Sequence, residues 1–278
     1  MQWLAAIEHL RSRREPGVLV TLAAVRGHSP RAAGAKMVVG RDGTWGSIGG
    51  GNLEATAVDQ ARELLARPGS GPSMFVADLS DKARVTHGVQ CCGGEVTVLL
   101  EPLAVPPAVA IFGIGHVGLE LARILARHDL DLHLVDSRSG QLTDQALAAL
   151  DDAEARVHRH VPVLPELVLA ELPAGTHVLV MTHDHAEDAA LCDAALRCEH
   201  LASIGLIGSR AKWARFRKKL ADEGHGPSTI SRISTPIGLP ELQGKDPATI
   251  ALAVAASLLQ AFEREPAHLR PSSSGIVR

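Results

Sequence analysis

Over the first hundred residues, hydrophobic and polar positions alternate in short runs, and two stretches have helical periodicity, one at the start and one in the middle. The segment "MQWLAAIEHLRSRRE" predicts an amphipathic helix with one apolar side formed by Trp3, Leu4, Ile7 and Leu10. A second helix is expected from residue 52, with Asn52 as its N-cap and Pro68-Gly69 as its stop. Runs rich in Val, Leu and Ile predict strands over 17–27, 35–39, 73–79 and 94–103. This part of the chain therefore predicts an α+β domain.

From residue 108 the pattern changes to a regular alternation of apolar strands and helices. Strands are expected over 108–115, 130–138, 156–160, 176–183, 203–209 and 229–235. Helices are expected over 116–129, 142–150, 191–200, 211–224 and 246–265, of which the second has the weakest pattern. Apolar runs that are separated by helices are typical of a parallel sheet covered on both faces. This half predicts a doubly wound α/β domain.

The length of the chain and its proline content divide these two patterns. A chain of 278 residues exceeds the roughly 100 to 200 residues of a usual single domain. Three prolines in "EPLAVPPA", residues 101–108, predict a stiff connector. We therefore expect an N-terminal α+β domain over 1–103, a Rossmann-like doubly wound parallel-sheet domain over 107–265, and a flexible polar tail over 266–278.

Charge and hydropathy exclude some classes of partner. A net charge of −3 provides no positive field for nucleic acid or for an acidic membrane surface. No apolar run approaches the roughly 18 residues of a membrane span, and the N-terminus lacks the apolar core of a signal peptide. We expect a cytoplasmic protein that binds neither nucleic acid nor membrane, with its four cysteines reduced.

The motif Gly113-Ile114-Gly115-His116-Val117-Gly118 follows a predicted strand and opens a predicted helix, as a dinucleotide fingerprint does. Asp136 ends the next strand 23 positions after Gly113, close to the roughly 20 expected for a ribose-binding acid. Asp136 favours a free ribose hydroxyl, whereas Arg138 blurs that preference. Alternatively, the glycines only allow the helix to pack closely on the sheet.

A second glycine-rich stretch, "GSIGGG", leads directly into the helix that begins near Asn52. Gly49, Gly50 and Gly51 permit positive φ angles and expose N–H groups, which together with a helix N-terminus form a cradle for an anion such as phosphate. The alternative is a flexible helix entry with no ligand.

Two adjacent cysteines, Cys91 and Cys92, precede Gly93-Gly94. Adjacent cysteines do not form the CxxC knuckle of a structural zinc site. A thiolate beside flexible backbone suits a soft metal ligand, a sulfur carrier or a thiol of low pKa. The alternative is a pair of small buried hydrophobic residues at a strand start.

Two further features lie in the second half of the chain. His183, Asp184 and His185 follow a strand end, where they form either a metal pair or a helix cap. The segment "AKWARFRKK" predicts an amphipathic helix whose basic face is either solvated or docks a partner. Cys192 and Cys198 are expected in the core.

The sequence closely resembles the XdhC/CoxI family of xanthine dehydrogenase accessory proteins across almost its whole length. The resemblance is carried by "GHSPRAAGAKM", "GSIGGGNLEATA", "VQCCGG", "FGIGHVG", "VDSR", "VMTHDHAEDAAL", "IGLIGSRAKWARF" and "TPIG". It implies a non-catalytic chaperone that binds the molybdenum cofactor (molybdopterin), protects it and inserts it into xanthine dehydrogenase. The implied partners are the molybdenum subunit of that enzyme and a cysteine desulfurase, and the resemblance also allows a homodimer.

The resemblance assigns the cofactor to residues of both halves. In the first half they are Gly49, Gly50, Gly51, Glu54, Cys91 and Cys92, with the two cysteines facing molybdenum. In the second half they are Gly113, Gly115, His116, Gly118, Asp136, Arg138 and His183, where NAD(P) or another nucleotide is the other candidate ligand. The competing hypotheses are an NAD(P)-dependent oxidoreductase with Cys91 or Cys92 as its redox thiol, and a sulfurtransferase that itself adds sulfur to the metal.

Overall fold

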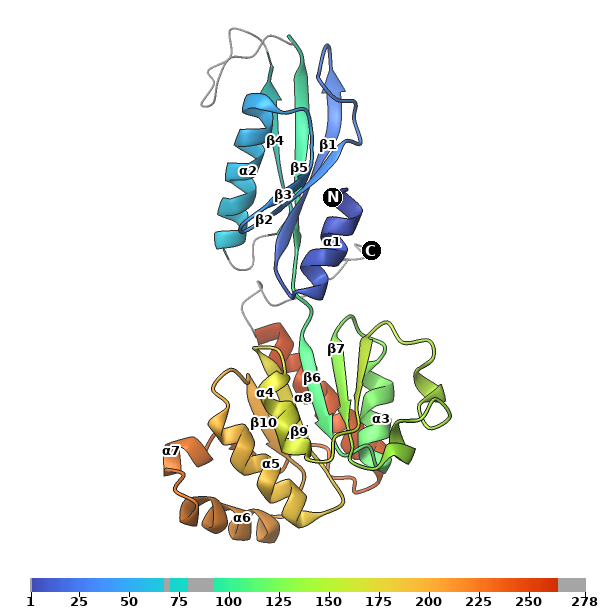
Figure 1. Ribbon diagram of the computed structural model, residues 1–278, viewed down its shortest axis with the longest axis vertical. Coiled ribbons are helices and arrows are strands. Elements are labelled where there is room, and N and C mark those ends of the chain that lie inside the picture. Colours follow the sequence, from blue (N-terminus) through green and yellow to red (C-terminus); the bar gives the residue numbers. More distant parts are fainter. Residues whose placement is uncertain (1, 68–70, 80–92, 265–278) are drawn as a thin grey trace. The chain divides into compact units, whose positions relative to one another are not determined.

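The computed structural model describes residues 2–67, 71–79 and 93–264. The chain divides into two compact units at Val105 and Pro106, and each unit contains its own sheet (Figure 1). In the described residues no helix is both long and apolar enough to cross a membrane.

The first unit is built on a five-stranded antiparallel sheet with the strand order β3-β2-β1-β5-β4. The strands are β1 (Gly17–Arg26), β2 (Lys36–Gly40), β3 (Thr44–Gly46), β4 (Ser73–Asp78) and β5 (Glu95–Leu103). A turn joins β2 to β3, since Gly40 N donates to Gly43 O at 2.8 Å. Alternation along β1 sends Val18, Val20 and Leu22 to one face of the sheet.

Two helices cover opposite faces of this sheet (Figure 1). Helix α2 (Gly51–Ala66) packs Leu53, Ala57 and Ala61 on the face of Val18, whereas α1 (Trp3–Ser12) packs Ala6 and Leu10 against Val38 on the other. The expected apolar side of α1 is wrong at one position: Leu4 is 57% exposed and Ala6 is buried in its place, because the helix meets the sheet along a line rotated towards Ala6.

The start of α2 also differs from the expectation for Asn52. The N-cap is Gly50 and the helix begins at Gly51, so Asn52 lies inside the first turn. Gly49, Gly50 and Gly51 have φ angles of 133°, 73° and 61°, a region that residues with a side chain rarely adopt. The glycines redirect the chain, and the helix therefore begins earlier than a polar cap would indicate.

The second unit is a six-stranded parallel sheet with the order β11-β10-β9-β6-β7-β8. Its strands are β6 (Ala108–Phe112), β7 (Asp131–Val135), β8 (Arg156–His160), β9 (Thr176–Val180), β10 (Ser203–Leu206) and β11 (Ile233–Ser234). Numbered within this unit, the order is 6-5-4-1-2-3, which is the Rossmann arrangement. The sequence-based prediction of a Rossmann-like doubly wound sheet is confirmed. Its topological switch point lies between β6 and β9.

Helices cover both faces of the parallel sheet, as expected. Helices α3 (His116–Leu125) and α8 (Pro247–Arg264) share one core with Ile111 and Leu134. The other face is covered by α4 (Val168–Glu171), α5 (His185–Arg197), α6 (Arg210–Asp222) and α7 (Pro227–Ile230). Helix α8 thus belongs to the Rossmann unit.

Two expected elements of this unit are wrong. Instead of a helix over 142–150 there are short 3₁₀ turns, Ser139–Leu142 and Ala148–Leu150. The Thr143 hydroxyl accepts from Ala146 N at 3.2 Å, a local bond that competes with helix formation. The expected strand over 229–235 begins as α7, with Pro227 at its first position, and only Ile233–Ser234 join the sheet.

Candidate functional site

A pocket of about 720 Å³ lies at the carboxyl edge of the parallel sheet, where β6 and β9 end. Its wall includes Gly115 and His116 after β6, Arg138 after β7, and Thr182 and His183 after β9. Open α/β sheets bind their ligands at this switch point. The fold therefore brings the glycine motif, Arg138 and His183 together around one cavity.

The three glycines of the motif serve two purposes. A Cβ on Gly118 would lie 2.1 Å from Gly113 O, and one on Gly113 would lie 2.5 Å from Met181 O. These two positions are glycine because backbone passes directly against them. A Cβ on Gly115 would meet nothing within 4 Å, and Gly115 lines the pocket as the N-cap of α3. Packing explains two glycines, and space for a ligand explains the third.

Asp136 is 3% exposed and accepts hydrogen bonds at both carboxylate oxygens. Its Oδ2 accepts from Ile114 N and Arg138 Nη2, both at 2.8 Å. Its Oδ1 accepts from Arg138 N and Nε, both at 2.9 Å. Burial alone would raise the pKa of Asp136, but these hydrogen bonds outweigh it and hold the pKa below the ordinary value.

This arrangement changes the role expected for Asp136. A carboxylate offers about four acceptor sites, and the four bonds above use them. A ribose diol would have to displace the Arg138 guanidinium to reach Asp136. The structure thus presents Arg138, with its side chain 37% exposed, as the polar group facing the pocket at the end of β7.

The three side chains of the segment His183-Asp184-His185 have different roles. Asp184 is the N-cap of α5 and accepts from Ala186 N at 2.6 Å, so the capping interpretation is confirmed for it. His183 lines the pocket, while the ring of His185 meets the edge of Phe216 with centroids 6.4 Å apart. Burial raises the pKa of nearby Glu187, although His183 opposes the shift. Across the described residues no three His, Cys, Asp or Glu side chains are grouped to hold a metal ion.

Sequence reasoning missed an ion pair that supports this pocket. Lys212 of "AKWARFRKK" is 7% exposed and bonds Asp188 of α5, which is fully buried. Asp188 Oδ1 accepts from Thr182 N at 3.0 Å, and Lys212 Nζ donates to Ile207 O at 3.0 Å. The pair ties α6 to the loops after β9 and β10. Residues 212, 216 and 220 are the buried stripe of α6, and this i, i+4, i+8 spacing was the available signal.

Of the two cysteines expected in the core, Cys192 is fully buried and Cys198, the C-cap of α5, is only partly buried. Burial raises the pKa of the Cys192 thiol to about 12. A thiol in this state is neither a nucleophile nor a metal ligand at neutral pH. Cys198 is half-buried at the edge of the same core.

In the first unit the loop of Gly49 and Gly50 is organised by Glu54. The Oε2 atom of Glu54 accepts from Ser47 Oγ at 2.7 Å, Gly50 N at 3.1 Å and Ile48 N at 3.2 Å. The Glu54 carboxylate therefore accepts the Gly50 N–H group, which we expected to face a phosphate. A phosphate at these amides would compete with Glu54 and be repelled by it.

Three glycine-containing stretches meet at this end of the antiparallel sheet. A Cβ on Gly49 would lie 3.1 Å from Pro30 Cβ, and one on Gly94 would lie 2.1 Å from His28 O. The "GHSPR", "GSIGGG" and Gly93-Gly94 stretches are thus neighbours in the fold. Cys91 and Cys92, assigned to the metal by resemblance, lie outside the described residues.

Known proteins resemble this chain over nearly its whole length. It is 25% identical over 262 residues to the uncharacterized protein YqeB of Escherichia coli K12, covering 94% of this chain and 46% of YqeB. It is 26% identical over 299 aligned positions to the molybdenum cofactor insertion chaperone PaoD of the same organism, covering 96% of this chain and 91% of PaoD. The chain thus spans less than half the length of YqeB and most of PaoD.

A solved structure and two family models complete the comparison. The crystal structure of a protein described as a xanthine dehydrogenase, from Bacillus halodurans, has 20% identity and a TM-score of 0.48 over 99% of this chain and 98% of that chain. Residues 109–258 match the XdhC Rossmann domain, and residues 10–76 match the model named XdhC and CoxI family. With its Rossmann strand order and these matches over more than half its length, the chain belongs to the XdhC and CoxI family.

Proposed function

We propose that this protein is a chaperone of the molybdenum cofactor, which binds the cofactor as cargo and inserts it into a molybdoenzyme of the xanthine dehydrogenase type. The observation that carries the proposal is the correspondence with PaoD, a named molybdenum cofactor insertion chaperone, along 96% of this chain and 91% of PaoD. In this role the protein is an accessory factor and not a catalyst.

The pocket of the Rossmann unit supports an anionic cargo. The N-terminus of α3 carries a partial positive charge and N–H groups at His116 and Val117, and the Arg138 guanidinium stands on the same wall. We propose that the terminal phosphate of the cofactor binds here, beside Gly115. Because Glu54 already holds the Gly50 loop, this pocket suits a phosphate better than the first glycine-rich loop does.

The remaining expected contacts belong to the same proposal. We propose that Cys91 and Cys92 face the molybdenum end, since a thiolate is a soft ligand that matches a metal centre rich in sulfur. The molybdenum subunit of the recipient enzyme and a cysteine desulfurase are the proposed partners. A nucleotide such as NADP is the competing ligand for the pocket, because the GxGxxG geometry and Arg138 also suit a phosphorylated ribose.

The test is to load the purified protein anaerobically with excess molybdenum cofactor and count the retained pterin and molybdenum. In Gly115→Val the new side chain enters the open space of the pocket, so retained pterin should fall about tenfold or more while the fold persists. Gly140→Val is the matched control, because a Cβ there also meets nothing within 4 Å and Gly140 does not line the pocket.

The same preparation separates the metal contact from the phosphate contact. Cys91→Ser and Cys92→Ser should keep the pterin and lose molybdenum or the ability to activate a cofactor-free recipient enzyme. Parent protein that retains no cofactor, yet binds NADP in a way that Gly115→Val removes, would favour the oxidoreductase hypothesis instead.

A further inference from the structure

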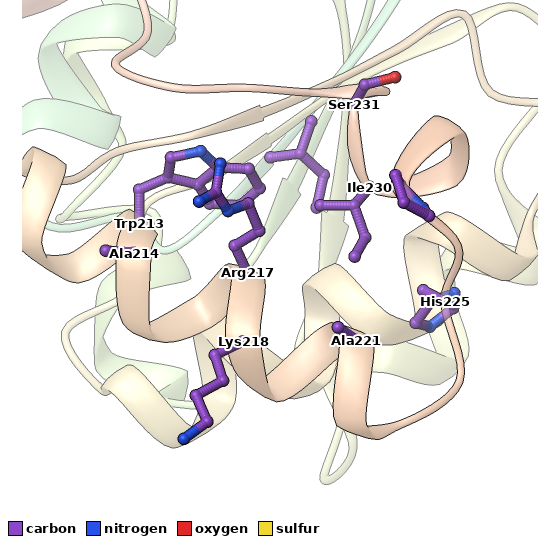
Figure 2. A pocket seen from close by; sticks show the side chains of 10 residues that line it. Trp213, Ala214, Arg217, Lys218, Ala221, His225, Ile230 and Ser231 are labelled. Atoms are coloured by element: carbon purple, nitrogen blue, oxygen red, sulfur yellow. The ribbon is translucent and has the colours of Figure 1, made fainter.

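A second pocket, of about 650 Å³, lies between α6 and α7 beside the edge strand β11 (Figure 2). Its floor is Ile230 and Ile233, which are 4% and 5% exposed, and Trp213 forms an aromatic wall. None of its lining residues belongs to the pocket beside Gly115. It is therefore a separate cavity of the Rossmann unit, and the proposed cargo site does not account for it.

Uncompensated positive charge stands at this pocket. Arg217 and Lys218 line it from exposed positions of α6, and the end of the Lys218 side chain points away from Trp213 and Ile230 (Figure 2). Other lysines of α6 are paired within the protein: Lys212 bonds Asp188, and Lys219 lies 3.8 Å from Glu223. Within the described parts of the chain, neither Arg217 nor Lys218 has an acidic partner. In a protein of net charge −3 this is a local cationic site.

The walls of the pocket are held in place by hydrogen bonds behind it. His225, in the turn between α6 and α7, bonds Asp193 of α5 at 2.6 Å. Arg232 donates to Leu196 O at 3.0 Å and to Cys198 O at 2.9 Å, which fixes the chain directly before Ile233. A cavity whose walls are already ordered costs less conformational entropy to fill.

We propose that this pocket docks an acidic segment of a partner protein, which inserts one apolar or aromatic side chain between Trp213 and Ile230 and places a carboxylate on Arg217. Trp and Arg around an apolar floor are the side chains that most often carry binding energy in protein interfaces. Arg217 is exposed, so an Asp or Glu side chain of a peptide passing over the pocket can reach its guanidinium. The identity of the partner rests on the proposed function: it is the enzyme that receives the cofactor.

The experiment measures fluorescence anisotropy of a fluorescein-labelled twelve-residue peptide with a central Phe flanked by Asp and Glu. Two matched peptides replace the Phe by Ala or the acidic residues by Lys. The full chain is compared with Arg217→Glu, which reverses a pocket charge, and with Ala221→Trp, which fills the pocket from an exposed rim position. Arg215→Glu is the control, because Arg215 is exposed on the same helix but does not line the pocket.

We expect the parent protein to bind the Phe peptide about tenfold more tightly than the Ala or Lys peptide. Arg217→Glu and Ala221→Trp should each weaken binding of the Phe peptide about tenfold. Arg215→Glu should change that affinity by less than about threefold. Equal loss in Arg215→Glu and Arg217→Glu would mean diffuse charge attraction and would overturn the proposal, as would an absence of binding by the Phe peptide. Retained pterin is measured in the same variants. Loss of docking with pterin unchanged distinguishes this proposal from the cargo proposal.

Discussion

Individual glycines of one motif differ in what they tolerate. In Gly118→Ala the new Cβ would lie 2.1 Å from Gly113 O, so the helix must move away from the strand. We expect the free energy of unfolding to fall by about 3 kcal/mol, the upper range for an overpacked core. Gly115→Ala should cost about 1 kcal/mol or less, the difference between Gly and Ala as an N-cap. Urea denaturation of both variants measures this, and equal losses would contradict the assignment.

The Arg138–Asp136 pair predicts a pH dependence. The pKa of Asp136 is below its ordinary value, so the pair adds stability above about pH 4, and that stability is lost as the pH falls through the lowered pKa. In Arg138→Gln the burial of Asp136 dominates and its pKa should rise above the ordinary value. At pH 7 we expect this variant to lose about 2 kcal/mol, because a buried charge loses its ionic hydrogen bonds.

The difference between Arg138→Gln and the parent should shrink below about pH 4, where the unfolded carboxyl is also protonated. Urea denaturation at pH 7 and at about pH 3 is the measurement. Asp136→Asn in the Arg138→Gln background should recover part of the loss, since no buried charge remains. A loss that is the same at both pH values would assign Arg138 a packing role only.

At the scale of elements, α5 and α6 are joined by the Lys212–Asp188 pair. Lys212→Met should lower the free energy of unfolding by about 3 kcal/mol, because it leaves Asp188 charged and fully buried. Lys212→Met with Asp188→Asn should cost less than the two single changes added together, since the two side chains are in contact. Additive losses in urea denaturation would show that the pair is not coupled. Lys218→Met, at an exposed position of the same helix, is the control.

At the scale of the whole molecule, each unit buries its own core. The cores of Val18 and Val38 belong to the first unit, and those of Ile111 and Val178 to the second. We expect residues 106–264 to fold alone, with a cooperative urea transition and the circular dichroism of an α/β protein. A fragment that unfolds without cooperativity would show that the Rossmann unit depends on the first unit.

The sequence predicted most of the architecture, because periodicity is a local property. Alternation and apolar runs located nine of the eleven strands in the described residues, all except the short strands β3 and β11, and the expected helix that did not form was weakly patterned. At Thr143 a side-chain hydrogen bond to Ala146 N competes with the expected helix, and at Pro227 the proline ring favours a helix start. A periodic pattern of apolar positions does not record either effect. The glycine motif and the Asp184 cap were visible because each has a fixed spacing from a helix start.

The partner of each polar group was decided by the tertiary structure. The sequence by itself determined that Asp136 follows a strand at the expected distance from Gly113, that "AKWARFRKK" is basic, and that Glu54 lies near a glycine-rich loop. Only the fold showed that the Asp136 carboxylate accepts hydrogen bonds from Arg138 and that the buried Lys212 bonds Asp188. It also showed that the Glu54 carboxylate accepts from backbone N–H groups of the glycine-rich loop before it. The physical reason is competition: a carboxylate has few acceptor sites, and the sequence does not show which donors the folded backbone brings within hydrogen-bonding distance of them.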